Sequence, residues 1–229
     1  GKGFNVSRLL KGLGTPSVAV GFLGGRAGQM LEDGLCSLGI STDFVWVSGE
    51  TRTNVSIVTE AHDHYIKVNE KGPLVPPAKQ QELLDKIDEL AQPEDWWVMA
   101  GSLPPAVAED FYARIVAVLN RHGARAVLDT SGEALRVGCL ERPYLVKPNA
   151  EEAAAITGLP MNTPAEIAAG AAAIRASGAQ NVVVSMGKAG ALLHTAEGTW
   201  LVHTPKVQEK NPIGAGDSMV GGLVWALTR

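Results

Sequence analysis

The sequence predicts an α/β fold: a three-layer α/β/α sandwich around a mostly parallel central sheet, with a separate antiparallel β-hairpin. Two patterns carry this prediction. From residue 78 onward, segments with apolar residues at helical spacing alternate with short unbroken apolar strands, which is typical of a parallel sheet covered by helices on both faces. Earlier in the chain, residues 54–60 and 64–69 alternate apolar and polar side chains around His62 and Asp63, which is typical of an antiparallel hairpin.

The other elements follow in chain order. A glycine turn at residues 1–3 opens a first helix, which Gly12, Gly14 and Pro16 end. The pattern then predicts a strand at 18–23, a tight turn at 24–28, a helix at 30–38 and a strand at 44–47. The alternating part predicts helices at 78–90, 107–122, 133–140, 150–157 and 164–177, with strands at 96–100, 126–129, 144–146 and 181–185. A hairpin of strands 191–194 and 200–203 precedes a last helix that begins near Ala215.

The composition is that of an ordinary globular protein able to bury a core: 229 residues, 45% hydrophobic and 19% charged, with a net charge of −4. The lack of a basic stripe argues against a nucleic-acid partner. No apolar run reaches the roughly 20 residues that a membrane span requires. Cys36 and Cys139 lie far apart without a CxxC pairing, which fits a reducing cytosol. We therefore expect a cytoplasmic protein without a membrane partner.

The two ends of the chain suggest that a longer protein was cut. The sequence opens without Met on a Gly-Lys-Gly turn, and it closes at Arg229 just as a helix is completing. We therefore expect the fold to be truncated at both ends.

The glycine-rich turn at residues 211–216 delivers Asp217 onto the opening of an apolar helix. Free backbone N–H groups and the helix dipole make such a position an anion site, and small residues let a phosphate approach. A carboxylate beside it could accept a proton from an attacking hydroxyl. Alternatively, Asp217 only complements the dipole of a core helix that packs through Gly221 and Gly222.

Polar, glycine-rich or proline-rich segments follow four of the predicted strands. In parallel sheets, ligands collect at the carboxyl ends of the strands. We therefore expect one shared cleft bordered by residues 101–105, 129–132, 147–149 and 185–190.

Two of these segments carry candidate ligand residues, and each has a plainer interpretation. Asn149 and Glu152 lie three apart at a helix start, so their oxygens could face a hydrated Mg²⁺, or they form a helix capping box. Residues 185–190 could bring backbone N–H groups to nucleotide phosphates, or they form a hairpin turn. Each signal is weak alone.

Further candidates lie in the first half of the chain. Asn5 could hydrogen-bond a polyol or cap its helix. Arg52 and Asn54 could converge on an anion or on sugar hydroxyls, or they lie at a solvated strand end. His62 and His64 lack a nearby third ligand, so we interpret them as surface residues rather than a metal site.

Several catalytic classes are excluded because their motifs are absent. The sequence contains no Walker A motif, since neither Gly-Lys pair is followed by Ser or Thr. It also contains no His-Arg-Asp catalytic loop and no Gly-x-Ser-x-Gly elbow. The sequence therefore carries none of the catalytic motifs of P-loop phosphotransferases, protein kinases or α/β-hydrolases.

Taken in this order, the segments resemble the ribokinase-like (PfkB) carbohydrate kinases, and within them the 1-phosphofructokinase and tagatose-6-phosphate kinase group. The resemblance covers essentially the whole chain. It is carried by residues 1–14, 51–54, 69–73, 101–104, 129–135, 146–149, 185–190 and 214–222.

The resemblance implies a role for each matching residue. Asp217 would be the catalytic base, with Gly214, Ala215 and Gly216 as the anion hole. The sugar-phosphate side would comprise Gly1, Lys2, Asn5, Arg52, Asn54, Ser102 and Asp217. The nucleotide side would comprise Lys147, Asn149, Ser185, Gly187, Gly190, Gly214 and Gly216. Asn149 and Glu152 would organise Mg²⁺, mostly through water.

The resemblance also implies a single kinase domain over residues 1–229, with lid elements at about 43–69 and the catalytic and nucleotide-binding part at about 78–229. Two departures stand out. Pro212 replaces a common Thr, which removes a hydroxyl and a backbone donor. A first strand with a substrate-binding Asp would precede Gly1, and helices completing the adenine pocket would follow Arg229.

The implied reaction is ATP- and Mg²⁺-dependent phosphorylation of a ketohexose monophosphate. Fructose 1-phosphate, converted to fructose 1,6-bisphosphate, is the first candidate acceptor, because Lys2 and Arg52 offer charge that a neutral sugar would not need. Tagatose 6-phosphate and fructose 6-phosphate are the alternatives. From another class, the chain could be a module that binds nucleotide or sugar phosphate without turnover. A homodimer is the expected assembly.

Overall fold

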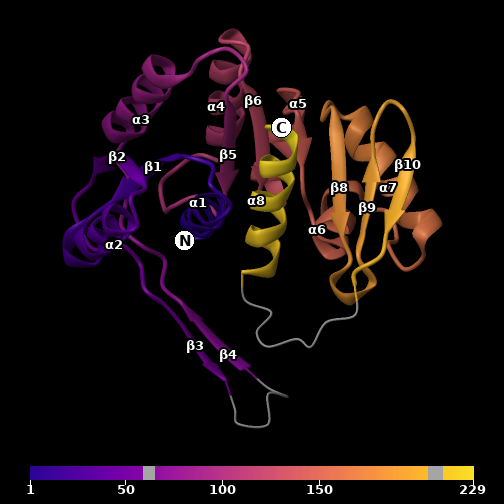
Figure 1. Cartoon of the computed structure of the whole chain (residues 1–229), viewed down its shortest axis with the longest axis horizontal. Helices are drawn as coiled ribbons and strands as arrows, with labels where there is room; N and C mark the ends of the chain where they lie inside the picture. The colour runs from indigo at the N-terminus through magenta and orange to yellow at the C-terminus, as the bar shows by residue number, and fades with distance from the viewer. Residues whose placement is uncertain (59–64, 206–213) are drawn as a thin grey trace.

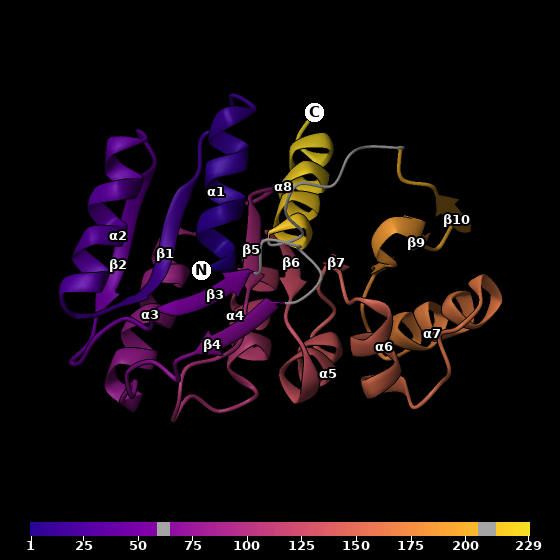
Figure 2. The same ribbon diagram turned by 90° about the horizontal axis from the view of Figure 1, so that it is seen from below.

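A computed structural model describes residues 1–58, 65–205 and 214–229, and it has the predicted three layers (Figure 1). Helices α1 (Lys2–Gly12) and α8 (Ala215–Leu227) cover one face of the central sheet, as Figure 2 shows. The opposite face carries four helices, with α3 (Pro77–Leu90) beside the first of them. These four are α4 (Phe111–Arg121), α5 (Gly132–Leu140), α6 (Ala150–Thr157) and α7 (Pro164–Ala176).

The central sheet is mostly parallel, which confirms the prediction. Its order is β10-β9-β8-β7-β6-β5. The four strands from β5 to β8 run parallel, whereas β9 and β10 add an antiparallel edge. The strands are β5 (Trp96–Ala100), β6 (Arg125–Asp129), β7 (Leu145–Val146), β8 (Asn181–Ser185), β9 (Ala191–His194) and β10 (Thr199–Val202). Strands β6 and β8 read as unbroken apolar runs because both of their faces are buried.

The layer formed by α1 and α8 matters for the site, because the two helices pack together over the sheet. Val6 and Leu10 of α1 share a buried cluster with Val220 and Val224 of α8, against Val127 of β6. The contact between the helices is close, since a Cβ built on Gly221 would lie 2.8 Å from a methyl group of Leu9. This packing fixes the first turn of α8 beside that of α1.

A second, smaller sheet stands beside β5. Strands β1 (Val18–Leu23) and β2 (Ser41–Trp46) pair in parallel and are joined by α2 (Gly25–Ser37). Phe4 of α1 packs edge-to-face on Phe44 of β2, with 5.6 Å between ring centroids. The predicted strand at 44–47 thus pairs with β1.

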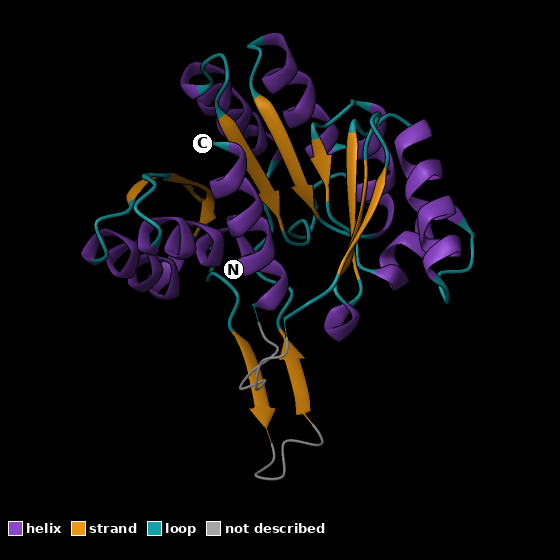
Figure 3. Cartoon of the chain, turned by 45° about the vertical axis from the view of Figure 1, so that its right-hand side comes forward, coloured by secondary structure: helices purple, strands orange, loops and turns teal. Residues whose placement is uncertain are grey.

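The predicted hairpin is confirmed by β3 (Asn54–Val58) and β4 (Tyr65–Asn69), which pair antiparallel and project from the body (Figures 1 and 3). Val55 lies opposite Val68 and Ile57 opposite Ile66. All four side chains are about half exposed, so the hairpin shows one apolar face to the surroundings. The loop with His62 and Asp63 lies outside the described residues.

Two helix starts differ from the prediction by more than one residue. The turn predicted at 24–28 is wrong, because these residues form the N-cap and first turn of α2. The carboxylate of Glu50 accepts the backbone N–H groups of Arg26 and Ala27 at 3.0 Å each, and this distant cap lets two glycines open a helix. Helix α4 begins at Phe111 rather than 107, after Ala106 adopts a positive φ of 63°.

Candidate active site

The carboxyl ends of β5, β6, β7 and β8 lie next to one another along one edge of the sheet. Backbone hydrogen bonds join the segments that follow them. Gly101 donates to the carbonyl of Asp129 at 3.0 Å, and Ser185 donates to the carbonyl of Pro148 at 3.0 Å. The four segments that the sequence placed at strand ends are therefore neighbours.

Asp217 lies in the first turn of α8, where it is only 6% exposed. Its Oδ2 accepts a hydrogen bond of 2.7 Å from Nδ2 of Asn5 in α1. Gly214 caps the helix with a φ of +84°, a left-handed conformation that favours glycine. The N–H groups of Ala215, Gly216 and Asp217 donate to no described residue, so the helix opening offers free donors beside a fixed carboxylate. Pro212 lies outside the described residues.

A buried lysine reaches this helix opening from the sheet. Nζ of Lys147, which follows β7, would lie 3.6 Å from a Cβ built on Gly216. The same ammonium lies 3.1 Å from Oδ1 of Asp129, and the Lys147 side chain is 5% exposed. A positive charge therefore sits beneath the backbone donors of the glycine turn, which strengthens this position as an anion site.

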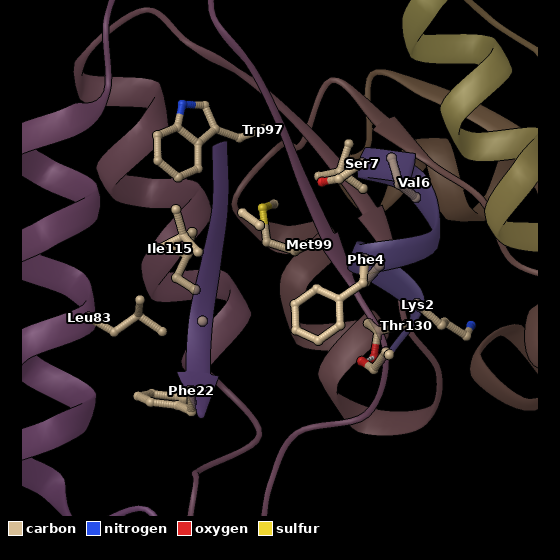
Figure 4. A pocket seen from close by; sticks show the side chains of 18 of the residues that line it. Lys2, Phe4, Val6, Ser7, Phe22, Leu83, Trp97, Met99, Ile115 and Thr130 are labelled. Carbon is tan, nitrogen blue, oxygen red and sulfur yellow. Dashed lines mark hydrogen bonds between the residues drawn. The ribbon is translucent and has the colours of Figure 1, made fainter. Parts of the chain in front are cut away.

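A pocket of about 1420 Å³ opens between β1 and β5. Figure 4 shows apolar side chains such as Phe22, Trp97 and Met99 along it, with Lys2 and Thr130 close together at one end. Nζ of Lys2 is 3.4 Å from Oδ2 of Asp129. The polar end of this pocket therefore adjoins the carboxyl ends of β5 and β6.

Five of the residues predicted for the sugar-phosphate side line this pocket, whereas Asn5 and Asp217 do not. Arg52 donates to Oγ of Ser102 at 3.1 Å, and both line the pocket with Gly1, Lys2 and Asn54. Lys71, which the sequence did not single out, also lines the pocket.

A second pocket of about 680 Å³ is lined by two of the residues predicted for the nucleotide side, Asn149 and Ser185, and by Lys188. The other predicted residues of that side do not line it: Lys147, Gly187, Gly190, Gly214 and Gly216. The segment after β8 forms a short 3₁₀ turn, η1 (Gly187–Ala189), that leads into antiparallel β9. It is thus a hairpin turn, as the plainer interpretation expected. Gly190 is required there by packing, because a Cβ would clash with the carbonyl of Val202.

Asn149 and Glu152 form a reciprocal capping box at the start of α6. Oδ1 of Asn149 accepts the N–H of Glu152, and Oε2 of Glu152 accepts the N–H of Asn149, both at 2.8 Å. No described residue donates to the second carboxylate oxygen of Glu152. One free carboxylate oxygen fits a hydrated Mg²⁺, which keeps several of its waters. Within the described residues, no cluster of three or more His, Cys, Asp or Glu side chains offers a dedicated metal cage.

Sequence reasoning missed the part played by Asp129. It identified the segment 129–132 as a strand-end loop but gave no role to a carboxylate that is 1% exposed between two lysines. A signal was present in the sequence, since a charged residue closing an otherwise apolar strand needs a buried partner. The lysine that follows β7 was the available candidate.

Comparison with known proteins identifies the family of the chain. The whole chain, residues 1–229, matches the pfkB family carbohydrate kinases. The chain belongs to this family. It is 36% identical to the 1-phosphofructokinase of Bacillus subtilis over 229 residues, covering 100% of this chain and 74% of that protein. It is 32% identical to a tagatose-6-phosphate kinase of Staphylococcus epidermidis over 230 residues, covering 99% and 74%.

Solved structures agree with the family assignment. The complex of phosphofructokinase-2 from Escherichia coli with fructose-6-phosphate superposes with a TM-score of 0.92 at 31% identity, covering 99% of this chain and 75% of that one. The tetrameric inhibited form of the same enzyme gives the same TM-score, identity and coverage. This pfkB-family protein is a carbohydrate kinase, and its relatives support a sugar phosphate as the acceptor. No described helix is long and apolar enough to cross a membrane.

Proposed function

We propose that this kinase transfers the γ-phosphoryl group of ATP to the 6-hydroxyl of fructose 1-phosphate, giving fructose 1,6-bisphosphate. The observation that carries this proposal is the pairing of Asp217 with the free N–H groups of the α8 first turn, above the ammonium of Lys147. Phosphoryl transfer depends mainly on positioning and on neutralising charge, and this arrangement supplies both.

In the proposed reaction, the acceptor hydroxyl lies against Asp217, whose carboxylate is oriented by Asn5. The hydroxyl oxygen bonds to the γ-phosphorus as the bond from phosphorus to the β,γ-bridging oxygen breaks. The hydroxyl proton passes to Asp217, and the electron pair of the broken bond leaves with ADP. The N–H groups at Ala215 and Gly216, with Lys147, stabilise the charge on the transferring group.

Glu152, oriented by its capping box with Asn149, is the residue that would hold Mg²⁺ through water. The ion would neutralise charge on the ATP phosphates. Glu152 lines the larger pocket and Asn149 the smaller one. We therefore place the sugar phosphate in the first pocket and the nucleotide against the second, with the start of α6 between them.

Positive charge at the first pocket supports a phosphorylated acceptor. Lys2, Arg52 and Lys71 all line it, and such a cluster suits a phosphate better than a neutral sugar. The β3–β4 hairpin starts at the edge of this pocket, because Arg52, which lines the pocket, lies two residues before β3. We propose that the hairpin is the lid over the sugar and that its closure excludes water.

Tagatose 6-phosphate and fructose 6-phosphate remain alternative acceptors, because the relatives include a tagatose-6-phosphate kinase and a phosphofructokinase-2 solved with fructose-6-phosphate. A coupled assay of ADP release, with each of the three sugar phosphates as acceptor, decides among them. We expect the highest kcat/KM with fructose 1-phosphate. Faster turnover of another acceptor would reassign the substrate, and equal inactivity on all three would defeat the proposed function.

A further inference from the structure

Asp129, the last residue of β6, is the most buried charged group at the strand ends, with 1% of its surface exposed. Its main chain is held from the β5 side, since Gly101 donates to its carbonyl. Its charge reaches the Tyr112 hydroxyl. Burial of Tyr112, the larger cause, and the negative charge of Asp129 together raise the pKa of Tyr112 to about 12. Removing a carboxylate from water is costly unless partners compensate it, so its partners matter.

The partners of Asp129 are two lysines from different parts of the site. Oδ1 lies 3.1 Å from Nζ of Lys147, and Oδ2 lies 3.4 Å from Nζ of Lys2. No described donor makes a hydrogen bond with Oδ1. The contact between Oδ1 and Lys147 is therefore an ion pair that lacks hydrogen-bond geometry. One carboxylate therefore holds two ammonium groups that would otherwise repel each other.

The two lysines lie in different parts of the site. Lys147 lies beneath Gly216 at the opening of α8, whereas Lys2 lies on the rim of the larger pocket, with its side chain 42% exposed. We infer that Asp129 is a positioning residue for phosphoryl transfer: it holds Lys147 against the transferring phosphoryl group and Lys2 against the phosphorylated acceptor. This inference rests on the proposed function.

A purely structural ion pair is the competing explanation. It predicts that loss of Asp129 weakens the fold but that its effect on turnover is independent of the lysines. A positioning role predicts instead that the effect passes through Lys147, so the two substitutions are not additive. The comparison between these explanations therefore needs a double-mutant cycle.

The test uses Asp129→Asn, Lys147→Met and the double variant in the intact protein, assayed with ATP and fructose 1-phosphate. We expect each single substitution to lower kcat on the order of 100-fold, because misplacing a charge by about 1 Å can cost that much. Adding Asp129→Asn to Lys147→Met should cost less than about 5-fold more. Asp88→Asn, which breaks the ion pairs of Asp88 with Arg121 and His122 between α3 and α4, is the control and should leave kcat within about 2-fold.

Two results would overturn the inference: native turnover in Asp129→Asn, or a further loss of about 100-fold when Asp129→Asn is added to Lys147→Met. If Asp129→Asn alone does not fold because it leaves Lys147 buried without a counterion, the comparison of Lys147→Met with the double variant still decides. Failure of the proposed function gives a different result, since the native protein would then release no ADP with any of the three sugar phosphates.

Discussion

At the scale of single residues, the glycines of the last helix separate packing from function. Gly214 needs its positive φ to cap α8, whereas Gly221 and Gly222 lie inside the helix. A Cβ on Gly221 would lie 2.8 Å from Leu9, but a Cβ on Gly222 would meet no atom within 4 Å. Adjacent positions of one helix therefore face different constraints.

This difference predicts opposite effects of one substitution on stability. Gly222→Ala should raise the free energy of unfolding by about 0.5–1 kcal/mol, because alanine favours the helix and fits. Gly221→Ala should gain nothing and should be about 1–2 kcal/mol less stable than Gly222→Ala, because the methyl group crowds Leu9. Urea unfolding of both variants measures this. Equal stabilisation by the two substitutions would mean that α1 and α8 do not pack this closely.

Single residues also show what local patterns can predict. The glycine turn and the following helical spacing were enough to place Asp217 in the first turn of a helix. They could not give its partner, since Asn5 lies 212 residues away in the chain. The ion pairs of Asp129 were missed for the same reason: the pairing depends on which strands are neighbours in the sheet.

At the scale of elements, the β3–β4 hairpin exposes an apolar face that is a candidate interface. Its apolar face, formed by Val55, Ile57, Ile66 and Val68, remains about half exposed. A two-stranded hairpin has little stability on its own, and exposed apolar faces commonly mark interfaces. We propose that this face packs against a second copy of the chain in a homodimer.

Ile57→Lys tests this dimer. The substitution places a charge on the proposed interface, so light scattering should show a fall from the mass of two chains to that of one. Met30→Lys, on an exposed position of α2, is the control and should leave the mass unchanged. A native protein with the mass of one chain, or a dimer that persists in Ile57→Lys, would refute the proposal.

Element boundaries were predictable where signals are local and failed where the cap is distant. Strand β5 and helix α6 have the predicted bounds because apolar runs and an Asn cap mark them. The start of α2 depends on Glu50, which lies 23–24 residues beyond the N–H groups that it accepts. No reading of residues 24–28 alone could find that cap.

At the scale of the whole molecule, the fold explains why the chemistry gathers in one place. Parallel strands bring Ser102, Asp129, Lys147 and Ser185 to one edge of the sheet, and the pairing of α1 with α8 brings Asn5 to Asp217. Alternation of helices and strands was enough to predict this edge. It was not enough to predict the separate β1–β2 sheet or the pocket beside it, since these depend on how distant segments pack.

The central claim is that Asp217 accepts the proton of the attacking hydroxyl. Asp217→Asn keeps the size of the side chain and its contact with Asn5 but removes the base. The decisive measurement is ADP release by this variant with ATP and fructose 1-phosphate, with ATP binding followed by calorimetry. We predict a fall in kcat on the order of 100-fold to 10,000-fold with nearly native ATP affinity; a kcat close to the native value would contradict the account.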